Sequence, residues 1–125
     1  MIELGRRLFG LLEIMANGVE VLWSGILDLR NSDSVISLSR TPDISKESLI
    51  LLVTRSNVSE WGEFAKSHTI VFDENVMNYF DSHSSAVCGD DLELEISLVS
   101  ESDWSFSSGY SYIYHVSILS VPLTQ

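Results

Sequence analysis

The chain has 125 residues, 45% of them hydrophobic, with seven Gly and two Pro. It is therefore neither collagen-like nor disordered, and it is long enough to bury a core without a disulfide or a metal. Eighteen Asp and Glu against seven Lys and Arg give a net charge of −11. Because such a surface repels phosphate backbones and anionic lipids, we expect no nucleic-acid and no membrane partner. The length predicts one globular domain over residues 1–125.

The cysteine content and the apolar runs bear on the cellular compartment. Cys88 is the single cysteine, so the chain has no internal disulfide that would indicate an oxidising compartment. The longest uninterrupted apolar run, Leu49 to Val53, is far shorter than the roughly 20 residues of a membrane span. We therefore expect a cytoplasmic protein.

The first 28 residues fit two different structures. Leu4, Leu8, Leu11, Leu12 and Met15 follow helical spacing, with Gly18 available as a C-cap. The alternative is a hairpin, because Asn17-Gly18 lies between the apolar runs 11–16 and 19–23, and Asn-Gly is a strong hairpin-turn signal. The turn signal favours strand–turn–strand, and the helix over residues 4–16 remains open.

The middle of the chain alternates between strands and short helices. We predict a long strand over Val19–Leu29, a turn at Asn31–Ser34 and a partner strand over Val35–Ser39. The continuous apolar run within Ser48–Thr54 predicts a strand covered on both faces. We then predict a helix over Val58–Lys66, a short strand over Thr69–Asp73, and a helical turn or second short helix over Glu74–Asp81.

The last third is strand-like. Leu92, Leu94, Ile96 and Leu98 alternate with polar residues, which predicts a strand with one solvated face. We predict a serine-rich loop over Ser100–Gly109 and a long strand over Tyr110–Val121 at the centre of a sheet. The fold class is therefore α+β, a mostly antiparallel sheet of six to eight strands with one or two short helices.

The charge is distributed unevenly along the chain. Residues 1–66 hold all seven basic and nine acidic residues, whereas residues 67–125 hold nine acidic residues and no Lys or Arg. One interpretation is solubility, since net negative charge keeps small proteins in solution. The other is a binding face for a cationic partner, because that partner would relieve the repulsion among the acids.

The Asp, Glu, His and Cys residues do not form a catalytic or metal-binding motif. Asp90 and Asp91 follow Gly89, whereas a calcium loop has its tight-turn glycine inside the loop. The spacing of His68, His83 and Cys88 matches no compact zinc signature. We therefore predict no metal site, no cofactor, no catalytic residues and no enzymatic activity.

The aromatic residues near the C-terminus suggest a contact surface. Trp104 and Phe106 fall in the predicted loop beside Glu101 and Asp103, so we expect them to be exposed and to bind protein. The tyrosines of the following strand, Tyr112 and Tyr114, are expected to face the core.

A small, acidic, motif-poor α+β domain has the character of proteins that bind and block a cationic protein. Immunity proteins that neutralise toxins, nucleases among them, use this physics, because their carboxylates occupy the place of phosphates. The residues expected to bind the basic partner are Asp90, Asp91, Glu93, Glu95, Glu101, Asp103, Trp104 and Phe106. The alternative hypothesis is a small acidic secretion or assembly chaperone, or a phage-type accessory protein, which would use an apolar groove or a sheet edge.

Overall fold

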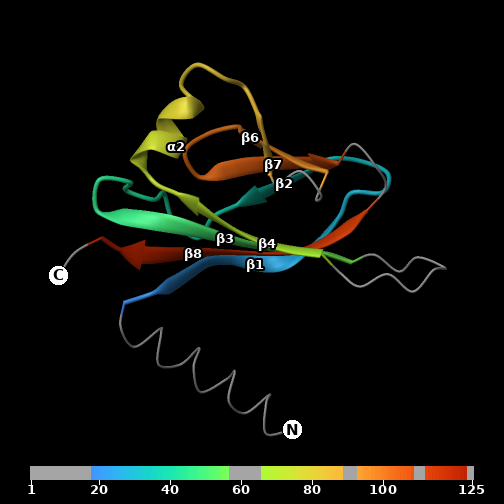
Figure 1. Cartoon of the computed structure of the whole chain (residues 1–125), viewed down its shortest axis with the longest axis horizontal. Helices are drawn as coiled ribbons and strands as arrows, with labels where there is room; N and C mark the ends of the chain where they lie inside the picture. The colour runs from blue at the N-terminus through green and yellow to red at the C-terminus, as the bar shows by residue number, and fades with distance from the viewer. Residues whose placement is uncertain (1–17, 57–65, 89–92, 109–111, 124–125) are drawn as a thin grey trace, which may run out of the picture.

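The computed structural model describes residues 18–56, 66–88, 93–108 and 112–123, which form eight strands and one short helix (Figure 1). The expected class is confirmed: the protein is α+β with mostly antiparallel sheet. The elements are β1 (Glu20–Asp28), β2 (Ser34–Ser37), β3 (Glu47–Ser56), β4 (Lys66–Phe72), α2 (Glu74–Tyr79), β5 (Ala86–Cys88), β6 (Leu94–Leu98), β7 (Asp103–Ser108) and β8 (Ile113–Pro122).

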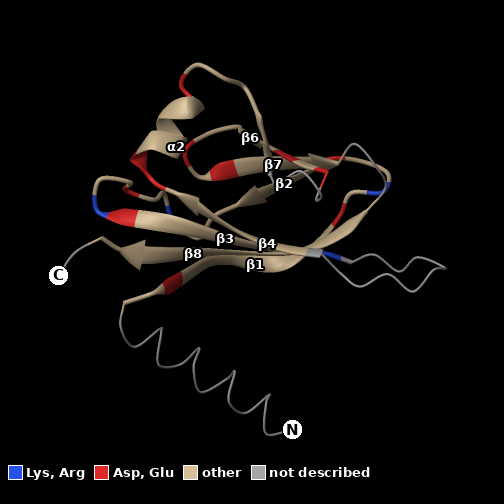
Figure 2. Cartoon of the chain, viewed as in Figure 1, with Lys and Arg blue, Asp and Glu red and all other residues tan. Residues whose placement is uncertain are grey.

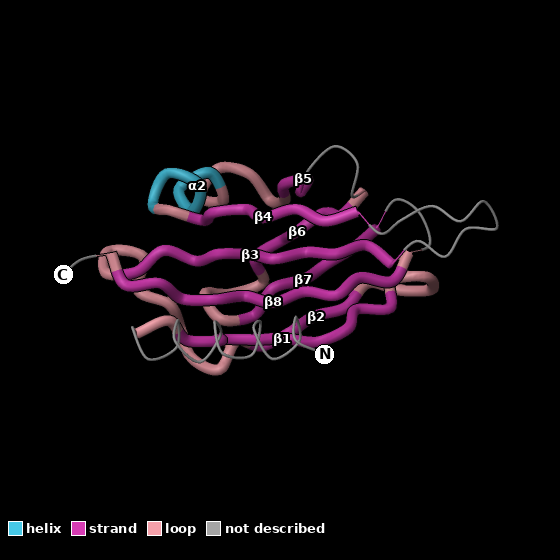
Figure 3. Tube along the Cα trace, turned by 60° about the horizontal axis from the view of Figure 1, so that its bottom comes forward, coloured by secondary structure: helices cyan, strands magenta, loops and turns pink. Residues whose placement is uncertain are grey.

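The strands form two four-stranded antiparallel sheets that pack face to face (Figures 1 and 3). The first sheet has the order β1-β8-β3-β4, and the second has the order β2-β7-β6-β5. β8 lies between β1 and β3, which confirms the prediction that the last long strand occupies the centre of a sheet. The helix α2 packs beside β4 at the end of the sandwich.

The core lies between the sheets and is built from alternate residues of each strand. Every second side chain points inward, so a strand with apolar residues at period two buries one face. From β3, Leu49, Leu51 and Val53 are at most 1% exposed, and from β6, Leu94 and Ile96 are fully buried. The alternation predicted for residues 92–98 is thus confirmed where the structure describes it.

Two inner-facing positions join the sheets by a polar contact. The Tyr114 hydroxyl of β8 is 3.0 Å from the Ser108 hydroxyl of β7, and it donates to the Glu93 carbonyl at 3.3 Å. Burial raises the pKa of the Tyr114 phenol above its usual value. Glu93 has a φ of +57°, a left-handed conformation that is uncommon for a residue with a side chain.

The predicted pairing of residues 19–29 with residues 35–39 is wrong. Both strands form, but β1 pairs with β8 in the first sheet and β2 pairs with β7 in the second. The bends between them carry the chain from one layer to the other, because both strands bury an apolar face and do so by facing each other across the core. Leu27 and Ile36, one from each strand, belong to that shared core.

Three other predictions can be compared with the structure, and two of them are wrong. The predicted loop over residues 100–109 is wrong, since residues 103–108 form β7. The expected two-sided covering of residues 48–54 is also wrong, because Leu52 on the outer side of β3 is 39% exposed. The predicted helical turn after residue 73 is confirmed as α2, and Asp73 caps it by accepting from the Val76 amide at 3.0 Å.

Two predicted segments lie outside the described residues: the helix or hairpin arm over residues 4–16, and the helix over residues 58–66 except for Lys66, which begins β4. In the described part of the chain, no helix has the length and apolar character needed to cross a lipid bilayer.

Candidate functional site

The acidic residues expected to bind a partner have different structural settings where the structure describes them. Asp90 and Asp91 lie outside the described residues. Glu95 points outward from β6 on the outer face of the second sheet, opposite Ser107 of β7. Glu101 lies in the turn between β6 and β7 and is exposed. Glu101 also lines a pocket.

Two other predicted acids have structural partners. Asp103 begins β7 and accepts a hydrogen bond from the Ser37 hydroxyl at 2.6 Å, which links the ends of β7 and β2. Glu93 is half-buried, and its backbone carbonyl accepts from Tyr114. Their roles in the described structure are therefore contacts within the second sheet and between the two sheets.

The expectation that Trp104 and Phe106 are exposed is wrong, since both are fully buried in the core. They occupy alternate inner positions of β7, and Trp104 lies against Phe72 of β4 with ring centroids 5.4 Å apart. The physical reason is the period-two pattern of β7, in which Ser105 and Ser107 face out and the aromatic rings of Trp104 and Phe106 face in. The expected core position of Tyr114 is confirmed, and Tyr112 is half-buried.

A pocket of about 630 Å³ opens where three separate segments meet. They are the loop between β2 and β3, the helix α2 with the turn after it, and the turn between β6 and β7 (Figure 1). Its apolar lining includes Ile44, Met77, Phe80 and Leu98, and its acidic lining residues are Asp43, Asp81 and Glu101. We call it the acidic pocket.

The acidic pocket combines an apolar surface with negative charge. None of the described residues that line it is Lys or Arg, and Figure 2 shows the acidic positions of α2 and of the β6–β7 turn in the same part of the molecule. Hydrogen bonds from the Ser45 hydroxyl and amide lower the pKa of Asp43 below its usual value. Lys46 approaches Asp43 at 3.9 Å, but its side chain is 82% exposed, so this pair contributes little.

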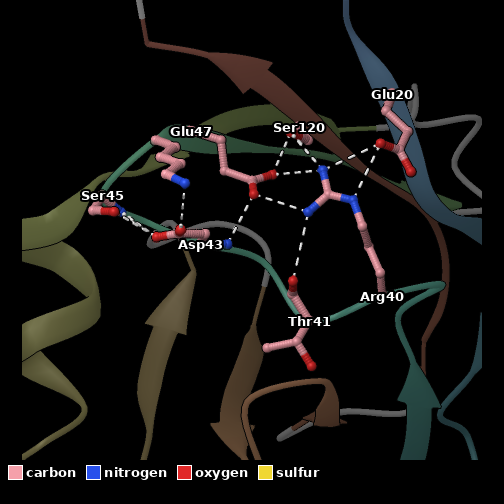
Figure 4. Close-up of polar contacts among 8 residues, drawn as sticks. Glu20, Arg40, Thr41, Asp43, Ser45, Glu47 and Ser120 are labelled. Atoms are coloured by element: carbon pink, nitrogen blue, oxygen red, sulfur yellow. Dashed lines mark hydrogen bonds and ion pairs between the residues drawn. The ribbon is translucent and has the colours of Figure 1, made fainter.

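One wall of the pocket is held by a partly buried ionic network at the end of the first sheet (Figure 4). The Arg40 guanidinium donates two hydrogen bonds of 2.8 Å to the carboxylate of Glu47, and the two groups form a bidentate pair. Glu47 also accepts from the Ser120 hydroxyl and, at 2.8 Å, from the Asp43 amide. The last bond ties the pocket loop directly to the beginning of β3.

The network strongly favours the ionised form of Glu47. Hydrogen bonds from Arg40, and then those from Ser120 and Asp43, outweigh the opposing effect of burial and lower the pKa of Glu47 to about 2. The Arg40 guanidinium has its pKa raised by Glu47 and also bonds Glu20 of β1 at 3.2 Å. The pocket loop is thus anchored to β1, β3 and β8.

The opposite wall is α2, which is fixed by its cap and by ring packing. Phe80 at the end of the helix stacks on Phe72 of β4, with centroids 6.3 Å apart and planes inclined by 20°. Because Phe72 in turn contacts Trp104, the helix is joined to the aromatic core. Met77 and Phe80 then form the apolar side of the pocket, and Asp81 follows directly after them.

The sequence analysis missed Asp43 and Asp81 as site residues. Asp43 follows Pro42 in a loop and Asp81 follows a short helix, positions where an acid has no distinctive local pattern. Residues 43, 81 and 101 are far apart in the sequence, so only the tertiary structure brings them together. Within the described ranges, no three His, Cys, Asp or Glu side chains lie close enough to hold a metal ion.

Compared with protein-family models, with curated proteins and with solved structures, the chain gives no significant match. Chemically, the acidic pocket suits a group that is positively charged at its tip and apolar along its stem. Lys and Arg side chains have this character, since their methylene stems pack on apolar surface while the charged head remains near water or carboxylates.

Proposed function

We propose that this protein is an acidic binding module that neutralises a cationic protein, and that it acts as an immunity-type inhibitor of a toxin, with a nuclease as one candidate. The acidic pocket would receive a Lys or Arg side chain of that partner. The proposal rests on one observation: Asp43, Asp81 and Glu101 line a pocket whose other walls are largely apolar.

The charge of the whole chain supports the same partner. A net charge of −11, with no Lys or Arg after residue 66, would accelerate the approach of a basic protein and repel an acidic one. A pocket that buries the stem of one basic side chain would then slow dissociation, because buried anchors dominate the dissociation rate. Asp90 and Asp91, in the same half of the chain, would contribute to the first of these effects.

The test first identifies the partner and then measures the rates at which it binds and dissociates. The purified chain is used as bait, and the captured protein is then produced separately and measured against Asp81→Asn/Glu101→Gln. The matched control is Asp33→Asn/Glu95→Gln, which makes the same change in net charge at exposed positions outside the pocket lining. We expect the pocket variant to dissociate at least about tenfold faster and the control to dissociate at the wild-type rate.

Association rates provide the second measurement. Both variants lose two negative charges, so both are expected to associate slightly more slowly, with a weaker dependence on salt. A captured partner that is acidic, or one whose dissociation responds equally to the two variants, would contradict the role of the acidic pocket.

A second function is favoured by a different feature, an apolar groove of about 510 Å³ beside the edge strands β4 and β5. It is lined by Ile70, Phe72, Asn75, Val76, Tyr79, Phe80, Ala86 and Val87, none of which is charged. Tyr79 is 43% and Val87 is 67% exposed. A chaperone or accessory protein would bind an apolar segment of its client here, and strand edges can also accept an added strand.

The two functions predict opposite responses in the same binding assay. If the groove binds the partner, Tyr79→Ser/Val87→Ser weakens binding, the pocket variant does not, and binding is insensitive to salt. If the acidic pocket binds it, Asp81→Asn/Glu101→Gln weakens binding and the groove variant does not.

A further inference from the structure

The outer face of the first sheet carries three complete rows of side chains, each with one residue from every strand of that sheet. Figure 3 shows β1, β8, β3 and β4 side by side, and their pairing register defines the rows. The first row is Val21, Leu119, Ile50 and Val71; the second is Ser24, Ser117, Leu52 and Thr69; the third is Ile26, His115, Thr54 and Ser67. We call these twelve residues the neutral face.

The neutral face lacks charged side chains: none of its twelve residues, all of them in the described part of the chain, is Asp, Glu, Lys or Arg. A solvated surface is typically about 25–35% charged, so twelve positions would hold about three or four charges. The outer face of the second sheet, by comparison, includes Glu95 of β6 and Asp103 of β7. Because the whole chain has a net charge of −11, the missing charge is a property of this face and does not follow from the composition.

Large apolar side chains of the neutral face are open to solvent in the single chain. Ile26 is 61% exposed, Val71 is 52% exposed and Leu52 is 39% exposed. Hydroxyl groups lie between them and bond to each other, as Ser24 and Ser117 do at 2.9 Å. An exposed patch that combines aligned apolar residues with no charge is typical of a surface that binds another protein.

We propose that the neutral face is the interface of a symmetric homodimer, in which a second copy of the chain packs its own neutral face against the first. The electrostatics select this occupant. The face has no acid to attract a cationic protein and no Lys or Arg to attract an acidic one, whereas two uncharged faces complement each other. The acids of both copies then stay outside the contact, where salt screens their repulsion beyond about 8 Å at physiological ionic strength. Two-fold contacts of this self-complementary kind are the commonest in soluble oligomers.

The outer face of the first sheet is large enough for a stable dimer. Its central strands β3 and β8 have ten residues each, which corresponds to a length of about 34 Å, and four strands give a width of about 19 Å. The face therefore offers about 600 Å² per copy and about 1,200 Å² in a dimer, which reaches the range of about 1,200–2,000 Å² for specific interfaces. Sheets also pack face to face readily, with their strands inclined by about 30°.

The proposed dimer leaves the acidic pocket open. None of the residues that line this pocket belongs to the neutral face. In Figure 1, α2 and the turn between β6 and β7 lie on the side of the first sheet that faces the second sheet, opposite the neutral face. A dimer would therefore present two acidic pockets, and the dimer and the proposed inhibitory function can each fail without the other.

The first test is sedimentation equilibrium of the full-length chain in about 0.3 M NaCl, where general repulsion is screened. We expect wild type to dimerise with a Kd in the micromolar range. Leu52→Asp/Val71→Asp places two acids per copy on the neutral face and should raise this Kd at least about a hundredfold, because the contact would desolvate these charges and place like charges together. The control, Val35→Asp/Val87→Asp, adds the same charge on the outer face of the second sheet, at residues that are 61% and 67% exposed, and should leave the Kd unchanged.

A second variant and a second measurement guard against loss of the fold. Leu52→Thr/Val71→Thr adds no charge and keeps residues that suit an outward strand position, and it should raise the Kd at least about fivefold because apolar area is lost from the contact. If the aspartate variant loses the wild-type circular dichroism spectrum, the threonine variant decides the outcome. In a dimer assembled from labelled and unlabelled copies, isotope-filtered NMR should show contacts between copies from the methyl groups of Leu52, Val71 and Leu119.

Salt separates this contact from the acidic pocket. Dimerisation should strengthen as NaCl rises from about 0.05 M to about 0.5 M, because salt screens the repulsion between two acidic chains, whereas binding of a cationic protein should weaken. Asp81→Asn/Glu101→Gln should dimerise as wild type does.

Three results would overturn the proposal. One is a wild-type chain that remains monomeric at about 200 µM, a concentration well above the Kd expected of such an interface. The others are a dimer that the second-sheet variant disrupts as much as the neutral-face variants do, and contacts between copies that involve the methyl groups of Val35 or Val87 in place of those on the neutral face.

Discussion

Replacing Glu47 by Gln perturbs the anchor of the pocket loop with almost no change in shape. The Glu47 side chain is 9% exposed and receives hydrogen bonds from Arg40, Ser120 and the Asp43 amide. A glutamine keeps an oxygen that can accept, but it has no charge to match the Arg40 guanidinium. The substitution therefore imitates the protonated state of Glu47.

The expected cost follows from the pKa of this carboxyl. Folding lowers the pKa of Glu47 from 4.5 to about 2. Because one pKa unit corresponds to about 1.4 kcal/mol, the ionised form is favoured in the folded state by about 3 kcal/mol. Arg40 is 39% exposed, so solvent screens part of this effect. We expect Glu47→Gln to lower the free energy of unfolding by about 2–3 kcal/mol at pH 7.

The pH dependence provides a second, independent signature. The folded pKa lies below the unfolded one, so the contribution of Glu47 is fully present above pH 4.5 and is lost as the pH falls through about 2. The difference between wild type and Glu47→Gln should therefore shrink steadily below pH 4.5. Asp28, whose pKa is also lowered to about 2 by Arg30, is present in both proteins and cancels.

Urea denaturation followed by tryptophan fluorescence at pH 7, 5 and 3.5 measures this difference. Glu20→Gln is the control, because Glu20 contacts the same arginine but its side chain is 49% exposed, and we expect it to cost less than about 1 kcal/mol. A cost for Glu47→Gln below about 0.5 kcal/mol, or one that stays constant from pH 7 to pH 3.5, would refute the reasoning.

Three further substitutions test the fold. Trp104→Ala should lower the free energy of unfolding by about 3–5 kcal/mol in urea titrations, because it opens a cavity in the core; a loss below about 1 kcal/mol would show that the ring is not packed as described. Tyr114→Phe should cost about 1–2 kcal/mol by the same assay, since the Ser108 hydroxyl and the Glu93 carbonyl lose their shared partner, and an unchanged stability would argue against the contact between the sheets. Gly18→Ala should lower the melting temperature by a few degrees, because Gly18 has a φ of +94° that alanine adopts with strain; a rise in melting temperature would contradict that backbone conformation.

Local sequence pattern was enough to predict most of the strands. The alternation of Leu94 and Ile96 with Glu95 identified β6 and its buried face, because a strand exposes successive side chains on opposite sides. β7 was missed for a compositional reason: seven of the nine residues 100–108 are serines or acids, at outward or turn positions around its aromatic rings, and the serine-rich stretch was interpreted as a loop. The same error placed Trp104 and Phe106 on the surface.

The pocket could not be predicted in the same way. Glu101 was singled out because of its acidic and aromatic neighbours, but Asp43 and Asp81 have no local pattern that marks them. Their grouping with Glu101 depends on the Arg40–Glu47 anchor on one side and on the stacking of Phe80 on the other. Both contacts join residues of different elements.

The sequence by itself determined the buried face of a strand with clear alternation, such as β6, and the strongly acidic charge of the chain, because side-chain periodicity and charge are local properties. Tertiary structure alone decided which strands pair and which acids share a pocket. Strands Glu20–Asp28 and Ser34–Ser37 are neighbours in the chain and still belong to different sheets. The backbone hydrogen bonds that pair strands are the same for every sequence, so the choice of partner depends on how the apolar faces of the whole chain pack together.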